Sequence, residues 1–416
     1  MRFHYWFVFL YFISFYANAE DKARVLKIYH DSDYSNHRAS ANAMKMGLLT
    51  ALAEVNNQVQ GYQLQLVEKD HRGNSNRSLL HIRQFIDDSD ALAILGGLHS
   101  PPYIKYRNFI NENGVLLLIP WAAGGPITRY PDGVNWVYRL SIDDTKAGFT
   151  LVEHAKRALK CKSIHTLLEN TPWGKSNDKT IRDAAGVNNA PAVTWFNWNT
   201  QLNSAKIMIR EIIQSDADCI VFVGNALEGS HFVNAMLSFP KELQIPIVSH
   251  WGITGGNFWS SARTALQQGV VLHFIQSCFS LRNYKRYPRA KATVTSAQAL
   301  FPAAMKNIEI LPAPTGFVHS YDLGRLLISA LSNTTLTDDI KHNRAALRDA
   351  LEQINLPVVG LIKTYEVPFS TWSADNDDAH EALGLADFCM AKYDDDGGVV
   401  LLPQLNRKLN DKSVIK

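Results

Sequence analysis

The sequence is poor in cysteine, in charge of one sign and in long apolar runs. Its 416 residues include four cysteines and no C-x-x-C pair, so the common cysteine spacing of a zinc site is missing. Lys and Arg exceed Asp and Glu by only three, which favours neither nucleic acid nor a membrane surface as a partner. Beyond the N-terminal segment, no apolar run approaches the length of a membrane span. The composition therefore indicates an ordinary globular protein.

Signatures of common enzymes are also missing. The sequence has no G-x-x-x-x-G-K-[ST] loop, no G-x-G-x-x-G, no G-x-S-x-G elbow and no H-E-x-x-H. Its 14 histidines are scattered, with no pair at metal-ligand spacing on one recognisable helix face. A hydrolase would have to use the adjacent His99 and Ser100, but neighbours on a turn do not place an imidazole against a hydroxyl. We therefore predict a protein that is not an enzyme, with no cofactor and no resident metal.

The N-terminal segment has the pattern of an export signal. Arg2 precedes an apolar, aromatic-rich stretch at 5–16, and Ala17-Asn18-Ala19 matches the A-x-A cleavage pattern. We expect residues 1–19 to be a signal peptide that is cleaved after Ala19, with an uncleaved anchor as the alternative. The apolar stretch is too short for a stable transmembrane helix. The mature chain is thus expected in the periplasm, without a membrane span.

The stretch from Ala93 to Thr128 organises the predicted fold. An apolar run at 91–95 ends in two glycines, and a second apolar run follows at 115–119. Between them, Ser100 precedes two prolines, a combination that favours the start of a helix. This stretch predicts two buried parallel strands joined by a helix.

The same alternation of strand and helix continues along the chain. Further strands are predicted at 25–29, 62–67, 136–140, 163–168, 192–198, 219–223, 245–248 and 270–274, with helical patterns between them. Such βαβ series form parallel sheets with helices on both faces. We therefore predict an α/β protein with two doubly wound, Rossmann-like lobes.

The turns after two neighbouring strands form the first candidate ligand site. His99 and Ser100 follow the strand at 91–95, and Trp121 begins the turn Trp121-Ala122-Ala123-Gly124-Gly125 after the next strand. Parallel strands end at one edge of the sheet, where helix N-termini and small residues present N–H groups to ligands. Ordinary tight turns of a doubly wound protein are the alternative interpretation.

Cys161 and Cys219 are candidates for a disulfide. Each lies at or just before the start of a predicted parallel strand, and the two strands should be neighbours. An oxidising compartment permits such a bond. Buried free thiols are the alternative.

Several motifs, taken in order, resemble the type I periplasmic substrate-binding proteins of branched-chain amino-acid ABC transporters, the leucine/isoleucine/valine-binding group. They are the helix ending Ala51-Leu-Ala-Glu-Val-Asn56, the GGLHS turn, Ile110-Asn-Glu-Asn113 followed by VLLLIPWAA, Trp173-Gly174-Lys175, and Gly316 to Leu323. The resemblance covers nearly the whole mature chain. It implies two lobes joined by a hinge of three chain crossings, which close on a small ligand.

The resemblance also implies where the lobes begin and end. The N-lobe would comprise residues 20–140 and 277–386, and the C-lobe residues 141–276 and 387–405. Residues 406–416 would form a C-terminal tail. The hinge crossings would accordingly lie near Ser141, near Ser277 and shortly before Phe388.

Ligand contacts are implied by the same motifs. In this family, backbone N–H groups and small hydroxyls of the two N-lobe turns hold a ligand carboxylate, which here implies His99, Ser100, Ala122, Ala123 and Gly124. Trp173 would be the C-lobe aromatic contact. In the N-lobe, the implied contacts thus resemble those of amino-acid binders.

Two departures from the family pattern bear on specificity. Gly124 stands where amino-acid binders often have a hydroxyl residue, and the loop from His250 to Gly256 lacks the usual carboxylate for the ligand's amino group. Glu228, in the loop that includes Asn225, is the candidate replacement. An exposed glutamate at a helix start is the alternative.

Aromatic residues are frequent in the loops expected at the cleft: Tyr34, Trp121, Trp173 and Trp251, the last beside His250. They favour a flat or cationic ligand held by stacking or cation–π contacts of about 0.5–2 kcal/mol each. A core role is the ordinary explanation for any one tryptophan. The resemblance implies an exported solute-binding protein that delivers an amino acid, or a related amine or amide, to an ABC permease. A periplasmic partner of a membrane sensor is the alternative.

Overall fold

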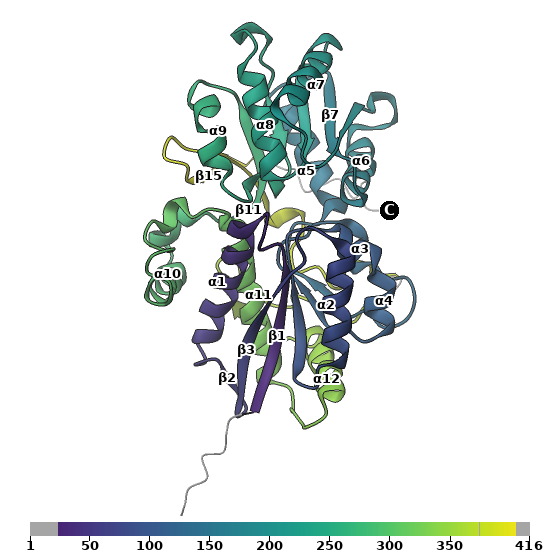
Figure 1. The fold of residues 1–416 in the computed structure, drawn as a ribbon, viewed down its shortest axis with the longest axis vertical. Helices are drawn as coiled ribbons and strands as arrows, with labels where there is room; N and C mark the ends of the chain where they lie inside the picture. The colour runs from purple at the N-terminus through teal and green to yellow at the C-terminus, as the bar shows by residue number, and fades with distance from the viewer. Residues whose placement is uncertain (1–23, 374, 405–416) are drawn as a thin grey trace, which may run out of the picture.

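A computed structural model describes residues 24–373 and 375–404 of the chain. Two lobes lie one above the other along the long axis, each built on a sheet with helices on both sides (Figure 1). The predicted α/β class with two Rossmann-like lobes is confirmed. The expected signal peptide at 1–19 and tail at 406–416 lie outside the described residues.

The lower lobe in Figure 1, the N-lobe, contains a six-stranded sheet in the order β2-β3-β1-β4-β5-β6. The strands are β1 (Arg24–Ser32), β2 (Gln58–Val59), β3 (Tyr62–Asp70), β4 (Ala91–Gly96), β5 (Leu117–Ile119) and β6 (Val137–Arg139). All neighbouring pairs are parallel except β2 and β3. The carboxyl ends of the parallel strands therefore meet at one edge, which faces the upper lobe.

Helices from two separate parts of the chain cover the N-lobe sheet. They are α1 (Arg38–Ala53), α2 (Ser75–Asp87), α3 (Pro101–Lys105), α4 (Arg107–Glu112), α10 (Pro288–Leu300), α11 (Pro314–Ser332) and α12 (Ile340–Glu352). One apolar core lies under α1 and α11, and another lies under α2, α3 and α4. Gly47 of α1 packs directly on the backbone of Phe317 in α11, where a side chain would have no room. The chain thus returns to the N-lobe to complete its first core.

The upper lobe, the C-lobe, contains a seven-stranded sheet in the order β15-β14-β11-β10-β9-β7-β8. Its strands are β7 (Ile164–Glu169), β8 (Ala192–Phe196), β9 (Cys219–Val223), β10 (Ile247–Ser249), β11 (Leu272–Ser277), β14 (Phe388–Tyr393) and β15 (Val399–Leu401). Its helices are α5 (Asp144–Arg157), α6 (Pro172–Ala185), α7 (Leu202–Gln214), α8 (Ala226–Leu237) and α9 (Phe258–Gln267). Strands β7 to β11 are parallel, and β14 and β15 add an antiparallel edge.

The remaining elements are short. A small hairpin consists of β12 (Val358–Val359) and β13 (Thr364–Tyr365). Turns of 3-10 helix lie at Gly125–Thr128 (η1), Val187–Asn189 (η2), Lys241–Leu243 (η3), Trp251–Thr254 (η4), Leu281–Arg286 (η5), Ile308–Ile310 (η6) and Leu385–Asp387 (η7). None of the described helices is long and apolar enough to cross a membrane.

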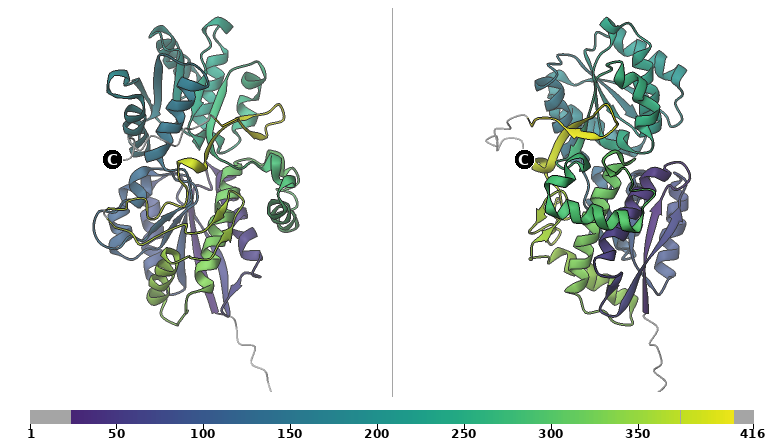
Figure 2. Two further views of the ribbon diagram at one scale, coloured as in Figure 1. Left: turned by 180° about the vertical axis from the view of Figure 1, so that it is seen from behind. Right: turned by 90° about the vertical axis from the view of Figure 1, so that its left-hand side faces the viewer.

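The chain passes between the sheets after β6, after β11 and before β14. Figure 2 shows the last of these segments, in yellow, joining the upper lobe beside the junction. Contacts between the lobes include a hydrogen bond of 3.2 Å from the Gly256 N–H to Ser40 Oγ and a contact of 3.1 Å between the hydroxyls of Thr254 and Thr315. The lobes are therefore closed on each other.

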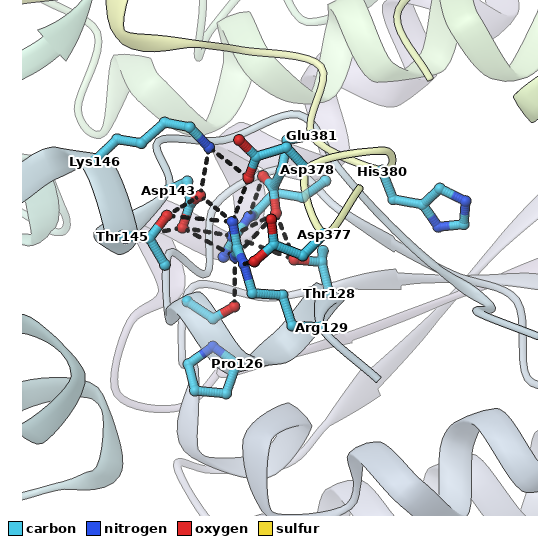
Figure 3. Close-up of polar contacts among 12 residues, drawn as sticks. Pro126, Thr128, Arg129, Asp143, Thr145, Lys146, Asp377, Asp378, His380 and Glu381 are labelled. Atoms are coloured by element: carbon cyan, nitrogen blue, oxygen red, sulfur yellow. Dashed lines mark hydrogen bonds and ion pairs between the residues drawn. The ribbon is translucent and has the colours of Figure 1, made fainter. Parts of the chain in front are cut away.

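A buried cluster of charges ties the first crossing to the segment 377–381 (Figure 3). Arg139, at the end of β6, contacts Glu381 at 2.6 Å and Asp143 at 2.9 Å. Lys146 of α5 contacts Asp378 at 2.8 Å. Burial by itself raises the pKa of Asp143, but the adjacent Arg139 holds it well below its usual range. Asp143 is therefore a buried carboxylate, and its charge is balanced by neighbouring cations.

Two disulfides pair the four cysteines, all of which lie in the described part of the chain. Cys161 joins Cys219, with their Cα atoms 5.9 Å apart, because β7 and β9 are neighbours and pair near their first residues. Cys278 joins Cys389 with a Cα separation of 5.0 Å. The sequence analysis does not foresee this second bond, which depends on the antiparallel pairing of β11 with β14.

Three local predictions differ from the structure. The helix that begins after Ser100 breaks at Tyr106, and the Ser100 hydroxyl makes no capping bond. Trp173, expected in a loop, lies in the first turn of α6, which begins at Pro172. The strand predicted at 192–198 ends at Phe196, so that Trp198 lies in a loop. Each difference changes where a side chain lies or which group it contacts.

Candidate ligand-binding site

The carboxyl ends of the parallel strands of both lobes face the junction between the lobes (Figure 1). This is the edge at which open α/β sheets bind ligands, because loops and helix starts of neighbouring strands converge there. In a two-lobed protein, the two edges together enclose one shared region.

Three tryptophans meet in this region. Trp121 of the N-lobe and Trp251 of the C-lobe are each 1% exposed, with ring centroids 6.1 Å apart and ring planes inclined at 56°. Trp173 contacts the ring of His250 edge-on at 5.2 Å. Aromatic pairs prefer such tilted or edge-on arrangements to direct face-to-face stacking. The lobes must part before a ligand can reach these rings, because the closed arrangement buries them.

Several polar atoms around the tryptophans lack partners among the described residues. They are the buried indole N–H groups of Trp121 and Trp173 and the Oδ2 atom of Asp144. A buried polar group without a hydrogen bond costs about 1–3 kcal/mol. These atoms are therefore available to hydrogen-bond a ligand held between the lobes.

His250 has a structural role beside the tryptophans. Its Nδ1 accepts the Gly252 N–H at the start of η4, so Nε2 carries the ring hydrogen and donates to Asp144 Oδ1 at 2.9 Å. Burial raises the pKa of Asp144, and the hydrogen bond with His250 opposes that shift. His250 thus links the start of η4 to that of α5.

The N-lobe turns use several of their polar groups within the protein. The Gly124 N–H donates to Ser100 Oγ at 3.0 Å, and the Ala123 carbonyl accepts the Asp144 N–H at 3.0 Å. A Cβ added at Gly124 would lie 2.7 Å from Ile104 Cδ1 and 3.0 Å from Ser100 Cβ. This packing explains why glycine stands here in place of a hydroxyl residue. Ala122 is buried in the same turn.

The C-lobe places two carboxyl groups near the junction. Glu169, the last residue of β7, is buried and accepts hydrogen bonds from Asn225 and Thr171, both at 3.1 Å. Glu228 is also buried, and it accepts the Asn199 N–H at 2.8 Å. The interpretation of Glu228 as an exposed helix-start residue is therefore wrong: it holds the loop that carries Trp198.

Tyr34 and His99 have polar partners in the N-lobe. The Tyr34 hydroxyl bonds to Nδ1 of His30 in β1 at 2.6 Å. His99 lies beside Asp33, with its Nε2 atom 3.3 Å from Asp33 Oδ2. The structure thus brings Trp121 to Trp251 and Trp173 to His250, whereas the described contacts of Tyr34 and His99 are with His30, Asp33 and Trp198.

Comparison with known proteins agrees with this architecture. Residues 31–376 match the sequence model of a family described as periplasmic binding protein, which is more than half of the chain. The chain belongs to the periplasmic binding protein family. No curated protein sequence matches it significantly.

Solved structures share the fold of this periplasmic binding protein at low sequence identity. A leucine-binding protein of Thermotoga maritima is 16% identical with a TM-score of 0.72, and the match covers 91% of this chain and 98% of that one. A solute-binding protein of R. palustris in complex with benzoate is 17% identical with a TM-score of 0.72 and coverage of 91% and 95%. A fatty-acid ABC transporter substrate-binding protein of Thermomonospora curvata is 15% identical with a TM-score of 0.73 and coverage of 92% and 92%. The predicted resemblance to type I periplasmic binding proteins is confirmed.

Sequence reasoning missed Asp144, Glu169 and Trp198 at the periplasmic binding protein's junction. Glu169 directly follows the predicted strand at 163–168, so a search of every strand end for polar residues would have found it. Trp198 was assigned to a strand and therefore not considered. Its ring lies 5.4 Å from that of His99 in the other lobe.

The pKa of Glu169 makes stability depend on pH. Burial raises this pKa from 4.5 to about 7, the nearby Glu228 adds to the shift, and hydrogen bonds from Trp198 and Thr171 oppose it. Because the folded state favours the protonated acid, the free energy of unfolding should fall as the pH rises through this range. One pKa unit corresponds to about 1.4 kcal/mol, so the expected fall is about 3 kcal/mol.

We therefore compare the free energy of unfolding of Glu169→Gln with that of the wild type. The variant's free energy of unfolding relative to the wild type should be about 2–3 kcal/mol higher at pH 8 than at pH 4. Urea denaturation of both proteins at several pH values would measure the difference. The relative stability should change mainly between pH 4.5 and pH 7. A difference that is constant across this range would show that Glu169 ionises normally in the folded protein.

Proposed function

We propose that this chain is an exported solute-binding protein that encloses a small molecule between its lobes and delivers it to an ABC transporter. The observation that carries the proposal is the contact between Trp121 and Trp251 across the lobes, beside indole N–H groups that lack partners. A ligand would bind to the parted lobes and favour the closed state by its contacts with both. The bound molecule would leave chemically unchanged.

The junction's chemistry favours an amino acid, or a related amine or amide, with a flat or cationic part. Glu169 and Asp144 supply oxygen acceptors in the C-lobe, and the three tryptophans supply ring faces. The proteins of similar fold include one named for leucine, one bound to benzoate and one named for fatty acids. Because these ligands differ widely, we derive the ligand class from this chain's own residues.

The place of action follows from the proposed role. We propose that residues 1–19 are removed after Ala19 and that the mature protein acts in the periplasm, where an inner-membrane permease would receive the closed form. Mass spectrometry of the protein purified from periplasm would give the mature N-terminus.

A thermal-shift screen of refolded, ligand-stripped protein would identify the ligand class. Amino acids, amides, quaternary amines and small aromatic carboxylates form the panel. A ligand at a hundred times its dissociation constant stabilises a fold by about 2.7 kcal/mol, which is several degrees for a protein of this size. A shift for at least one class supports the proposal. A panel without any shift argues against capture of these small molecules and favours a protein partner, such as a membrane sensor.

Trp173→Leu and Trp251→Leu are expected to weaken binding of that ligand two- to thirtyfold each. This range corresponds to the loss of a stacking or cation–π contact of about 0.5–2 kcal/mol. Isothermal titration calorimetry would measure the change. Trp136→Leu is the matched control, because Trp136 precedes β6 at the amino end of the sheet and packs under Arg348. Unchanged affinity in both junction variants would remove the tryptophans from the ligand site.

A further inference from the structure

Two imidazoles and a carboxylate form a compact group at the N-lobe edge of the junction. Donor atoms of Asp33, His37 and His99 all lie within 4.8 Å of one another. Asp33 Oδ2 is 3.1 Å from His37 Nδ1 and 3.3 Å from His99 Nε2. Tetrahedral zinc with bonds of about 2.0–2.1 Å has neighbouring ligand atoms about 3.4 Å apart. The observed separations are therefore close to those of a metal site.

The sheet topology brings these three residues together. Asp33 follows β1 and His99 follows β4, and these neighbouring parallel strands pair near their ends, with Asp31 opposite Gly96. A Cβ added at Gly97 would lie 2.9 Å from the Cα of Ser32, so glycine permits the two loops to touch. His37 lies one turn beyond Asp33 and donates its backbone N–H to the Asp33 carbonyl at 3.2 Å.

The carboxylate is oriented by its second oxygen. Asp33 Oδ1 accepts the backbone N–H of Asn36 at 2.8 Å, and Oδ2 lies toward the two imidazoles and accepts the Asn36 side-chain amide at 3.3 Å. Asp33 and His99 are buried, whereas the side chain of His37 is 16% exposed. A site with two buried donors and one accessible donor is held in shape before an ion arrives and can still be reached from solvent.

A third histidine next to this group has an unused donor. His71 follows β3, and its ring centroid lies 5.6 Å from that of His99. Its Nδ1 accepts the Gly73 N–H at 3.0 Å, so Nε2 carries the hydrogen. That Nε2 is buried and has no hydrogen-bond partner among the described residues. This N–H group is placed to donate a hydrogen bond to a water molecule or an anion that occupies the fourth coordination position of a metal.

The C-lobe covers the group in the closed arrangement. Trp198 lies 5.4 Å from His99, ring to ring, at an inclination of 39°. An added Cβ at Gly73 would lie 3.3 Å from the Trp198 ring and 3.4 Å from Asp33 Oδ2, which places that ring beside the carboxylate as well. Opening of the lobes would withdraw Trp198 and expose the group.

We propose that Asp33, His37 and His99 bind one divalent transition-metal ion of the zinc, nickel or copper class, which the C-lobe covers through Trp198 on closure. Two imidazole nitrogens and one carboxylate oxygen suit these ions, whereas magnesium and calcium prefer oxygen ligands alone. The ion would lie beside Trp198, whereas the amino-acid or amine ligand proposed above would contact Trp121, Trp173 and Trp251.

A second group of possible donors in the described residues does not have this character. Cys161 and Cys219 lie beside Asp218, but the two cysteines are joined in a disulfide. Asp218 accepts the backbone N–H groups of Lys162 and Ser163 at 2.8 and 2.9 Å. Its donor atoms are thus already used.

Calorimetric titration of untagged, EDTA-treated protein with Zn²⁺ would test the proposal. We expect one ion to bind per chain, and His37→Gln and His99→Gln each to weaken binding at least tenfold. His37→Gln is the safer variant for folding, because His37 is the partly exposed member; circular dichroism would verify both. Replacement of Zn²⁺ by Co²⁺ should give the visible absorption of a tetrahedral site, which His99→Gln should abolish.

His273→Gln is the matched control. It removes one partner of another histidine pair, in which His154 Nε2 lies 2.9 Å from His273 Nδ1 without a carboxylate donor. This variant should bind Zn²⁺ like the wild type. Absence of stoichiometric binding, or wild-type affinity in both His37→Gln and His99→Gln, would show that these imidazoles only hydrogen-bond Asp33. Either result would leave the outcome of the small-molecule screen unaffected.

Discussion

Arg139→Met is expected to lower the free energy of unfolding by about 3–5 kcal/mol. The Arg139 side chain is fully buried and donates to both oxygens of Glu381, at 2.7 and 2.6 Å. It also lies 2.9 Å from Asp143 and donates to the Gly124 carbonyl at 2.8 Å. Methionine fills a similar volume but leaves buried Glu381 with only the more distant guanidinium of Arg129, at 3.7 Å, as a neighbouring cation. Removal of one partner from a buried ion pair is costly because the remaining charge has lost its hydration.

Chemical denaturation followed by tryptophan fluorescence would measure this loss. Arg157→Met is a matched control, because Arg157 pairs with Glu153 on the surface of α5 and is 50% exposed. Exposed pairs of this kind contribute about 0.3–0.5 kcal/mol. The double variant Arg139→Met/Glu381→Met should recover part of the stability, since it removes the stranded carboxylate as well. An effect of Arg139→Met as small as that of Arg157→Met would contradict the structural role of the cluster.

The double variant Cys278→Ala/Cys389→Ala is expected to lose about 2–5 kcal/mol of stability. This disulfide spans 111 residues and ties the second chain crossing to the third. In the chain-entropy account, a crosslink across a long loop restricts the unfolded chain strongly and therefore favours the folded state. Its position beside the hinge also limits how far the ends of β11 and β14 can separate.

Thermal and urea denaturation of the oxidised wild type and of the double variant would give the difference. Cys161→Ala/Cys219→Ala is the comparison, because its disulfide spans 58 residues and lies within the C-lobe sheet. The loop-length term alone makes its effect smaller by about 0.6 kcal/mol. Equal stability of the wild type and the Cys278→Ala/Cys389→Ala variant would exclude a stabilising role for the hinge disulfide.

The elements of this protein follow largely from local sequence. The strand predicted at 219–223 is β9, residue for residue, and the run at 91–95 differs from β4 by one residue. Both strands are buried along their whole length, so every residue is apolar or small and the ends are marked by turn residues. The family could be recognised for a related reason, because its motifs lie at the ends of these elements. The contact between Trp121 and Trp251 could also be anticipated from the sequence, because loops that follow parallel strands converge.

Local sequence was less informative where one side chain had to choose among distant partners. Ser100 has the position of a helix cap, yet its hydroxyl accepts the N–H of Gly124, because the two turns are in contact. Cys278 and Cys389 could be paired only once β14 was known to lie antiparallel to β11. Glu228 was a candidate ligand residue with an exposed helix start as the alternative, and its carboxylate is buried and accepts the N–H of Asn199.

Sequence by itself determined the alternation of buried strands and amphipathic helices, and with it the two-lobed α/β fold and the edge of each sheet at which the loops converge. The tertiary structure decided which side chains share that edge: Asp33 and His99 come from strands adjacent only in the sheet, and Trp198 comes from the other lobe. The physical reason is the distance along the chain between the residues that determine each feature. Burial of a strand or helix face is encoded by the spacing of neighbouring apolar residues, whereas a site's chemistry depends on distances between loops that only the packed sheets and the closed lobes define.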